Sequence, residues 1–151
     1  MLNHQVANYS RIGLARTPGG SVWAMILDVT DASFQAEVLD RSATVPVIVD
    51  LWAPWCEPCK TIGPILEKLT KAANGKVVLA KVNVDQNPAI AAAFKAQSIP
   101  AVYAMKDGAV LDGFVGAYPE HVIEEFVRGL IPGEELVSVE SLLALGDETS
   151  L

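Results

Sequence analysis

Cys56 and Cys59 are the two cysteines of this 151-residue chain, and two residues separate them. An apolar run over residues 45–51 precedes them, and a helical pattern over residues 61–73 follows. Two thiols at this spacing on the first turn of a helix lie close enough to form a disulfide with little strain. The free N–H groups and the positive dipole end of that helix favour the thiolate, which is the form that attacks disulfides. The spacing therefore predicts a dithiol that cycles between oxidised and reduced forms.

Three other roles for the cysteine pair have to be weighed against redox chemistry. A structural zinc ion usually takes four nitrogen or sulfur ligands, and neither His4 nor His121 lies at ligand spacing from the pair. A purely structural disulfide would close a very short loop and so would constrain little of the unfolded chain. Inert buried thiols fit poorly with the neighbouring Trp55, Glu57 and Pro58. Redox chemistry is the favoured interpretation.

Composition and charge narrow the class of protein. The length suits one domain, and the apolar content of 51% is typical of a globular protein. The formal charge of −7, from 18 acidic and 11 basic residues, argues against a nucleic-acid partner. No apolar run approaches the ~20 residues that a membrane-spanning helix needs, and no secretory signal is evident. Two cysteines in such a chain point to the reducing cytoplasm.

Alternating strand and helix patterns predict an α/β fold with a mixed central sheet of about five strands and helices on both faces. The order is β-α-β-α-β-α-β-β-α, with Asn87 expected to cap the third helix and Asp-Gly at 107–108 expected to form a two-residue hairpin turn. The cysteines follow the carboxyl end of the second strand, where active sites of such sheets gather. The expected strands cover 22–27, 45–51, 76–84, 98–105 and 110–115, and the expected helices cover 32–39, 61–73, 89–96 and 119–130.

Several motifs together resemble the thioredoxin family over residues 22–130. They are the Val-Asp-Leu-Trp-Ala-Pro-Trp-Cys-Glu-Pro-Cys-Lys stretch at 49–60, Pro64, Lys81 followed by Val-Asn-Val-Asp, Ile99-Pro100, and Asp-Gly before the last strand. The resemblance implies a thioredoxin fold and an enzyme that reduces protein disulfides without a cofactor. Residues 1–20 have no sustained period and are expected to form a flexible N-terminal extension before a thioredoxin domain at 21–131. In the C-terminal extension (132–151), residues 138–146 have the pattern of a capped short helix that ends at glycine.

The resemblance assigns roles to the catalytic residues. Cys56 would be the exposed attacking thiol and Cys59 the buried resolving thiol. Asp50 would be a buried carboxylate that assists proton transfer at Cys59, with Lys81 as its usual neighbour. A structural Asp50, paired with Lys81, is the alternative. Burial and pairing push the pKa of Asp50 in opposite directions, and the sequence does not say which effect dominates.

The resemblance also implies a substrate-binding rim. Trp55 and Pro58 would frame the dithiol, Pro100 would be a cis proline facing the disulfide, and Gly116 would let a substrate chain approach. Glu57 departs from the family pattern, which has glycine before the motif proline. A carboxylate at this place opposes a second negative charge on the neighbouring sulfur, so we expect Glu57 to make the dithiol more reducing.

A narrower resemblance concerns partners. The residues at 37–42, 97–102, 112–117 and 119–120 are similar to the amino-terminal domain of thioredoxin-like co-chaperones that carry a tetratricopeptide tail. This resemblance implies an alternative function, in which the domain binds unfolded clients or protects their thiols. The expected partners are disulfide-containing or unfolded proteins, a thioredoxin reductase and chaperones.

Overall fold

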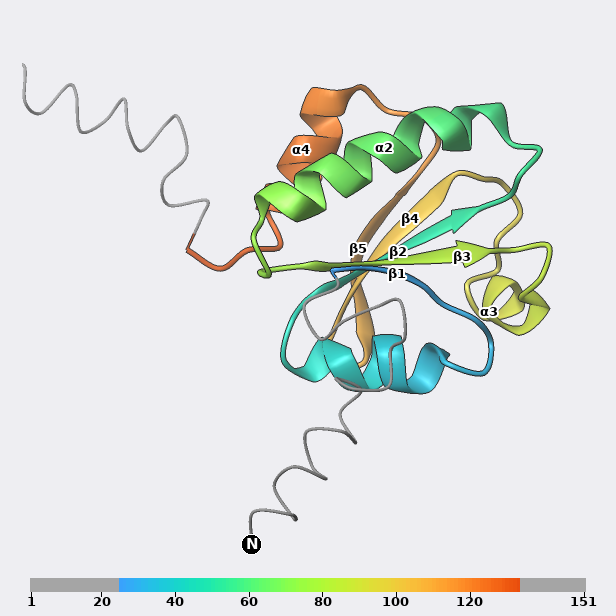
Figure 1. Cartoon of the computed structure of the whole chain (residues 1–151), viewed down its shortest axis with the longest axis horizontal. Helices are drawn as coiled ribbons and strands as arrows, with labels where there is room; N and C mark the ends of the chain where they lie inside the picture. Colours follow the sequence, from blue (N-terminus) through green and yellow to red (C-terminus); the bar gives the residue numbers. More distant parts are fainter. Residues whose placement is uncertain (1–24, 134–151) are drawn as a thin grey trace, which may run out of the picture.

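The computed structural model describes residues 25–133, which form a five-stranded mixed sheet between two layers of helices (Figure 1). The strand order is β1-β3-β2-β4-β5, with β1, β3 and β2 parallel and with β4 and β5 each antiparallel to the preceding strand in that order. This arrangement confirms the predicted fold class. The strands are β1 (Ile26–Asp28), β2 (Val47–Trp52), β3 (Val78–Asn83), β4 (Ala101–Lys106) and β5 (Ala109–Val115). The helices are η1 (Gln35–Asp40), η2 (Arg41–Ala43), α2 (Glu57–Ala72), α3 (Pro88–Ala93) and α4 (Glu120–Arg128).

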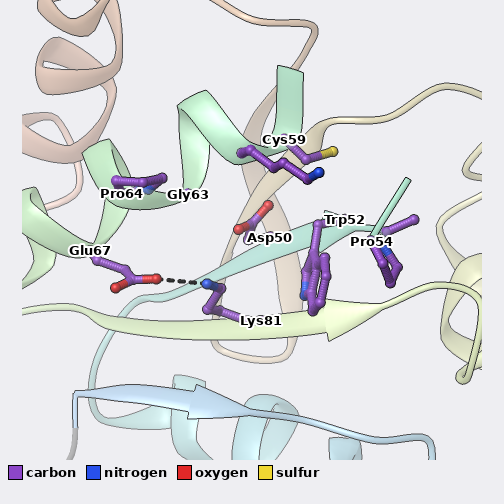
Figure 2. A pocket seen from close by; sticks show the side chains of 10 residues that line it. Asp50, Trp52, Pro54, Cys59, Gly63, Pro64, Glu67 and Lys81 are labelled. Atoms are coloured by element: carbon purple, nitrogen blue, oxygen red, sulfur yellow. Dashed lines mark hydrogen bonds and ion pairs between the residues drawn. The ribbon is translucent and has the colours of Figure 1, made fainter. Parts of the chain in front are cut away.

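The central strand β2 contributes to the core on both faces of the sheet. Val47, Val49 and Leu51 lie in an apolar cluster with residues of η1 and α3, whereas Ile48 lies in the cluster beneath α2 and α4. Because successive side chains of a strand point to opposite faces, Asp50 shares the α2 face with Ile48. A nearly continuous apolar run thus places one carboxylate under the helix that carries the cysteines (Figure 2).

The first helix differs from the regular helix predicted over residues 32–39. It is a π-helix at Gln35–Asp40 that continues into the 3₁₀ turn η2. The wide turn of a π-helix, with its i→i+5 hydrogen bonds, places residues five apart on one face. Phe34 and Leu39 have that spacing, and both pack against the same core cluster. Of the first predicted strand, residues 22–24 lie outside the described part, and β1 covers only Ile26–Asp28.

Asn87 is the N-cap residue of α3 and Pro88 follows it in the first turn, as predicted, but the Asn87 side chain forms no capping hydrogen bond with the helix. The side-chain Oδ1 of Asn87 accepts a hydrogen bond from the backbone N–H of Asp31 at 2.8 Å, and its side-chain Nδ2 donates to the backbone carbonyl of Asn83 at 2.9 Å. The Asp31 carboxylate instead accepts from the N–H groups of Ala89 and Ile90, at 3.1 and 2.9 Å. The free donors at this helix start are therefore satisfied by a residue from the loop after β1.

The predicted hairpin between β4 and β5 is confirmed. Asp107 and Gly108 form its two-residue turn and have positive φ angles of 54° and 78°, as a type I′ turn requires. The predicted helix at 138–146 falls outside the described residues. Within residues 25–133, no helix is long and apolar enough to cross a bilayer.

Candidate active site

A disulfide between Cys56 and Cys59 lies at the start of α2, with 5.3 Å between the two Cα atoms. Cys56 is the N-cap residue of this 16-residue helix, and its sulfur accepts a hydrogen bond from the Cys59 N–H at 3.3 Å. A negative charge on this sulfur would face the positive end of the helix dipole and a backbone donor. The helix start therefore stabilises the thiolate that disulfide exchange needs.

Cys56 is buried in this oxidised form, contrary to the expectation of an exposed thiol. Its residue is 3% exposed and Cys59 is 5% exposed. The bridge turns the Cys56 sulfur towards the helix, where the two cysteines pack with Ala53, Val84 and Ile99. Only a small part of the bridge is therefore accessible from solvent. The residues around it form a rim that a substrate chain must contact in order to reach the sulfurs.

One side of the rim is formed by Trp55, whose residue is 67% exposed. Its indole N–H donates to the Asp85 carboxylate, at 3.0 and 3.3 Å to the two oxygens. This contact with the loop after β3 fixes the orientation of a large apolar ring beside the disulfide. Asp85 was not among the predicted site residues, although it lies within the Val-Asn-Val-Asp motif.

Glu57 and Pro58, which lie between the two cysteines, are exposed. Pro58 lies in the first turn of α2, and the Glu57 carboxylate pairs with the Lys60 ammonium at 2.9 Å. This cation offsets part of the negative charge of Glu57. The expected effect of Glu57 on the neighbouring sulfur is therefore reduced by its pairing with Lys60.

The loop before β4 forms the opposite side of the site. The Ile99–Pro100 peptide bond is cis, as predicted, and Pro100 is buried. The Pro100 carbonyl accepts a hydrogen bond from the Gly116 N–H at 2.8 Å. Gly116 has a φ of 110°, a conformation that side chains disfavour, and a Cβ built there would meet no atom within 4 Å. The glycine leaves this side of the site open.

A cavity of about 270 Å³ lies between β2, β3 and α2, and both Asp50 and Cys59 line it (Figure 2). Asp50 is 2% exposed, and among the described residues its Oδ1 atom has no hydrogen-bond partner. Burial raises the pKa of Asp50 from 3.8 to about 7; the positive charge of Lys81 opposes the increase and the negative charge of Glu67 adds to it. The effect of burial on the pKa of Asp50 therefore exceeds the opposing effect of the Lys81 charge.

Lys81 forms its ion pair with Glu67, at 2.6 Å, and not with Asp50, as the structural alternative for Asp50 required (Figure 2). Lys81 is the register partner of Asp50 across β2 and β3, so the two are neighbours in the sheet. Glu67 was not among the predicted site residues. Its spacing of three residues from Pro64, one of the motif residues of the resemblance, offered a signal, because residues at i and i+3 share one helix face and both line the cavity.

These elements define a class of protein: an α/β oxidoreductase whose redox group is a dithiol at a helix start. The two sulfurs exchange a bond for two electrons and two protons, and a carboxylate in the cavity beside Cys59 can hold one proton near neutral pH.

Comparison with known proteins gives the family. The model of the family "Thioredoxin" matches residues 25–129. Thioredoxin from Chlorobaculum thiosulfatiphilum is 45% identical over 96 residues, which are 64% of this chain and 87% of that protein. Thioredoxin 1 from Nostoc is 41% identical over 97 residues, which are 64% of this chain and 89% of that protein. The chloroplastic M-type thioredoxin of Spinacia oleracea is 39% identical over 103 residues, which are 68% of this chain and 56% of that protein. The chain belongs to the thioredoxin family and is a thiol–disulfide oxidoreductase.

Proposed function

We propose that this chain reduces protein disulfides by a two-step exchange in which Cys56 attacks and Cys59 resolves. The Cys56 thiolate attacks one sulfur of the substrate, forming a mixed disulfide and releasing the other substrate sulfur as a thiolate. Cys59 then loses its proton and attacks Cys56, which releases the second substrate thiolate and forms the Cys56–Cys59 bridge. The substrate gains two electrons and the dithiol loses two.

The position of Cys56 as the N-cap of α2 is the observation that carries this assignment. Its sulfur is the one that accepts the backbone hydrogen bond at the helix start, so its thiolate is the better stabilised of the two. Asp50 is the proposed proton acceptor for Cys59, because both line the same cavity and a carboxyl with a pKa of about 7 can take up and return a proton at neutral pH. Trp55, Pro58, Pro100 and Gly116 form the proposed substrate rim.

Insulin reduction by dithiothreitol, compared with and without the protein, tests the reaction. We expect the wild-type protein to accelerate it, and we expect neither Cys56→Ser nor Cys59→Ser to do so. The two variants separate the roles, because Cys59→Ser should accumulate a mixed disulfide with a substrate, whereas Cys56→Ser should not. Trapping by Cys56→Ser alone would reverse the assignment.

The narrower assignments extend this proposal. A thioredoxin reductase would return the bridge to the dithiol, and the cytoplasm is the proposed location because a reducing compartment keeps the pair active. Residues 21–131 would form the catalytic domain, with extensions at 1–20 and 132–151. A co-chaperone role is tested with the double variant Cys56→Ser/Cys59→Ser. If this variant suppresses the aggregation of a denatured client protein, the co-chaperone role is supported. If it does not, the reduction of protein disulfides is the function that remains.

A further inference from the structure

The ion pair between Glu67 and Lys81 forms one wall of the cavity that contains Asp50 (Figure 2). The two side chains are 33% and 23% exposed, so water screens their attraction less than it screens a surface pair. The Lys81 ammonium passes close to Gly63 of α2, where a Cβ would lie 3.8 Å from its nitrogen. Gly63 therefore lies beside the extended Lys81 side chain, and a Cβ there would make only an ordinary van der Waals contact with it.

Lys81 therefore lies between two carboxylates and binds only one of them. Its backbone pairs with that of Asp50 across β2 and β3, yet its 2.6 Å contact is with Glu67. The Asp50 Oδ1 atom has no hydrogen-bond partner in the described part of the chain. A cation that binds a second carboxylate is less able to stabilise the charged form of the first.

The other groups around Asp50 do not replace this cation. From α2, Lys60 and Cys59 line the cavity, and the Lys60 ammonium is bound to Glu57 at 2.9 Å. From β4, the register partner of Asp50 is the uncharged Val102.

We propose that Glu67 is a positioning residue of the dithiol site, which binds the Lys81 ammonium, keeps it from pairing with Asp50, and so sets the pH at which Asp50 exchanges its proton. The catalytic consequence rests on the proposed function, in which Asp50 accepts the proton of Cys59. Loss of the Glu67 charge would free Lys81 to pair with Asp50. The ionised form of Asp50 would then persist to lower pH.

The test is the titration of the Asp50 carboxyl carbon by NMR in the oxidised protein, assigned with Asp50→Asn. We expect Glu67→Gln to lower the midpoint by about one pH unit. Glu124→Gln is the matched control, since it removes an acid that binds Arg128 at 2.7 Å on α4, and it should leave the midpoint unchanged. An unchanged midpoint in Glu67→Gln would overturn the proposal.

A double-mutant cycle separates positioning from the direct effect of the Glu67 charge. In a Lys81→Met background no ammonium remains to be released, so Glu67→Gln should lower the Asp50 midpoint less than it does in the wild type. Equal effects in the two backgrounds would show that Glu67 does not act through Lys81. The acid limb of the pH profile of insulin reduction should move in the same direction as the titration midpoint of Asp50. Full activity of Asp50→Asn would refute the proton-transfer role of Asp50 without affecting the titration result.

Discussion

Replacing Asp50 with asparagine should stabilise the oxidised protein, and the gain should grow with pH. The residue is 2% exposed, and burial raises its pKa from 3.8 to about 7. Between these values the folded state retains a proton that the unfolded chain has lost, so the stability of the wild type falls as the pH rises. At about 1.36 kcal/mol for each pH unit, the ionised carboxylate destabilises the folded state by ~4 kcal/mol once the pH exceeds about 8. Asparagine has a similar shape and does not ionise.

Urea denaturation at pH 4 and at pH 8.5 measures this effect. The free energy of unfolding of Asp50→Asn, relative to wild type, should be higher at pH 8.5 than at pH 4 by ~4 kcal/mol. Asp112→Asn, which removes an exposed carboxylate from β5, is the control and should shift this difference by less than ~0.5 kcal/mol. An equal relative stability of Asp50→Asn at the two pH values would refute the view that a buried, uncompensated carboxylate lies beneath α2.

Three further substitutions test other parts of the structure. Glu57→Gly should make the redox midpoint more oxidising by about 10–20 mV, as measured against glutathione, and an unchanged or more reducing value would contradict the expected repulsion. Asp31→Ala should lower the free energy of unfolding in urea by about 1–2 kcal/mol, because α3 loses its cap; no loss would mean that water replaces the carboxylate. Gly113→Ala should lower the melting temperature, at a cost of about 1–3 kcal/mol, since its Cβ would lie 2.6 Å from the Tyr103 ring. Gly129→Ala, with no contact closer than 3.4 Å, is the matched control.

Local patterns predicted the position of the dithiol and most of the elements around it. The continuous apolar run before Cys56 identified a buried strand, and Asp-Gly at 107–108 identified the hairpin, because each signal lies within a few neighbouring residues. The cis Pro100 followed from the resemblance together with the general exclusion of proline from strands.

Contacts between distant parts of the chain were not predictable in this way. Lys81 and Glu67 are 14 residues apart, and Asp31 caps a helix 58 residues further along the chain. A lysine beside two acids can pair with either, and only the packing of α2 on β3 decides between them. A polar residue before a proline, such as Asn87, fits a cap in sequence, yet a better-placed carboxylate from another loop took that role.

The capping of α3 by Asp31 connects the dithiol rim to the loop after β1 through the loop after β3. Asn87 bonds both to the Asp31 backbone and to Asn83, and Asp85 in the same loop binds the Trp55 indole. Local opening of this loop would release the indole and the first amides of α3 in one cooperative event. The indole hydrogen of Trp55 and the amide hydrogens of α3 should then exchange with solvent at a common rate, although the residues that carry them lie on opposite sides of β3 in the sequence.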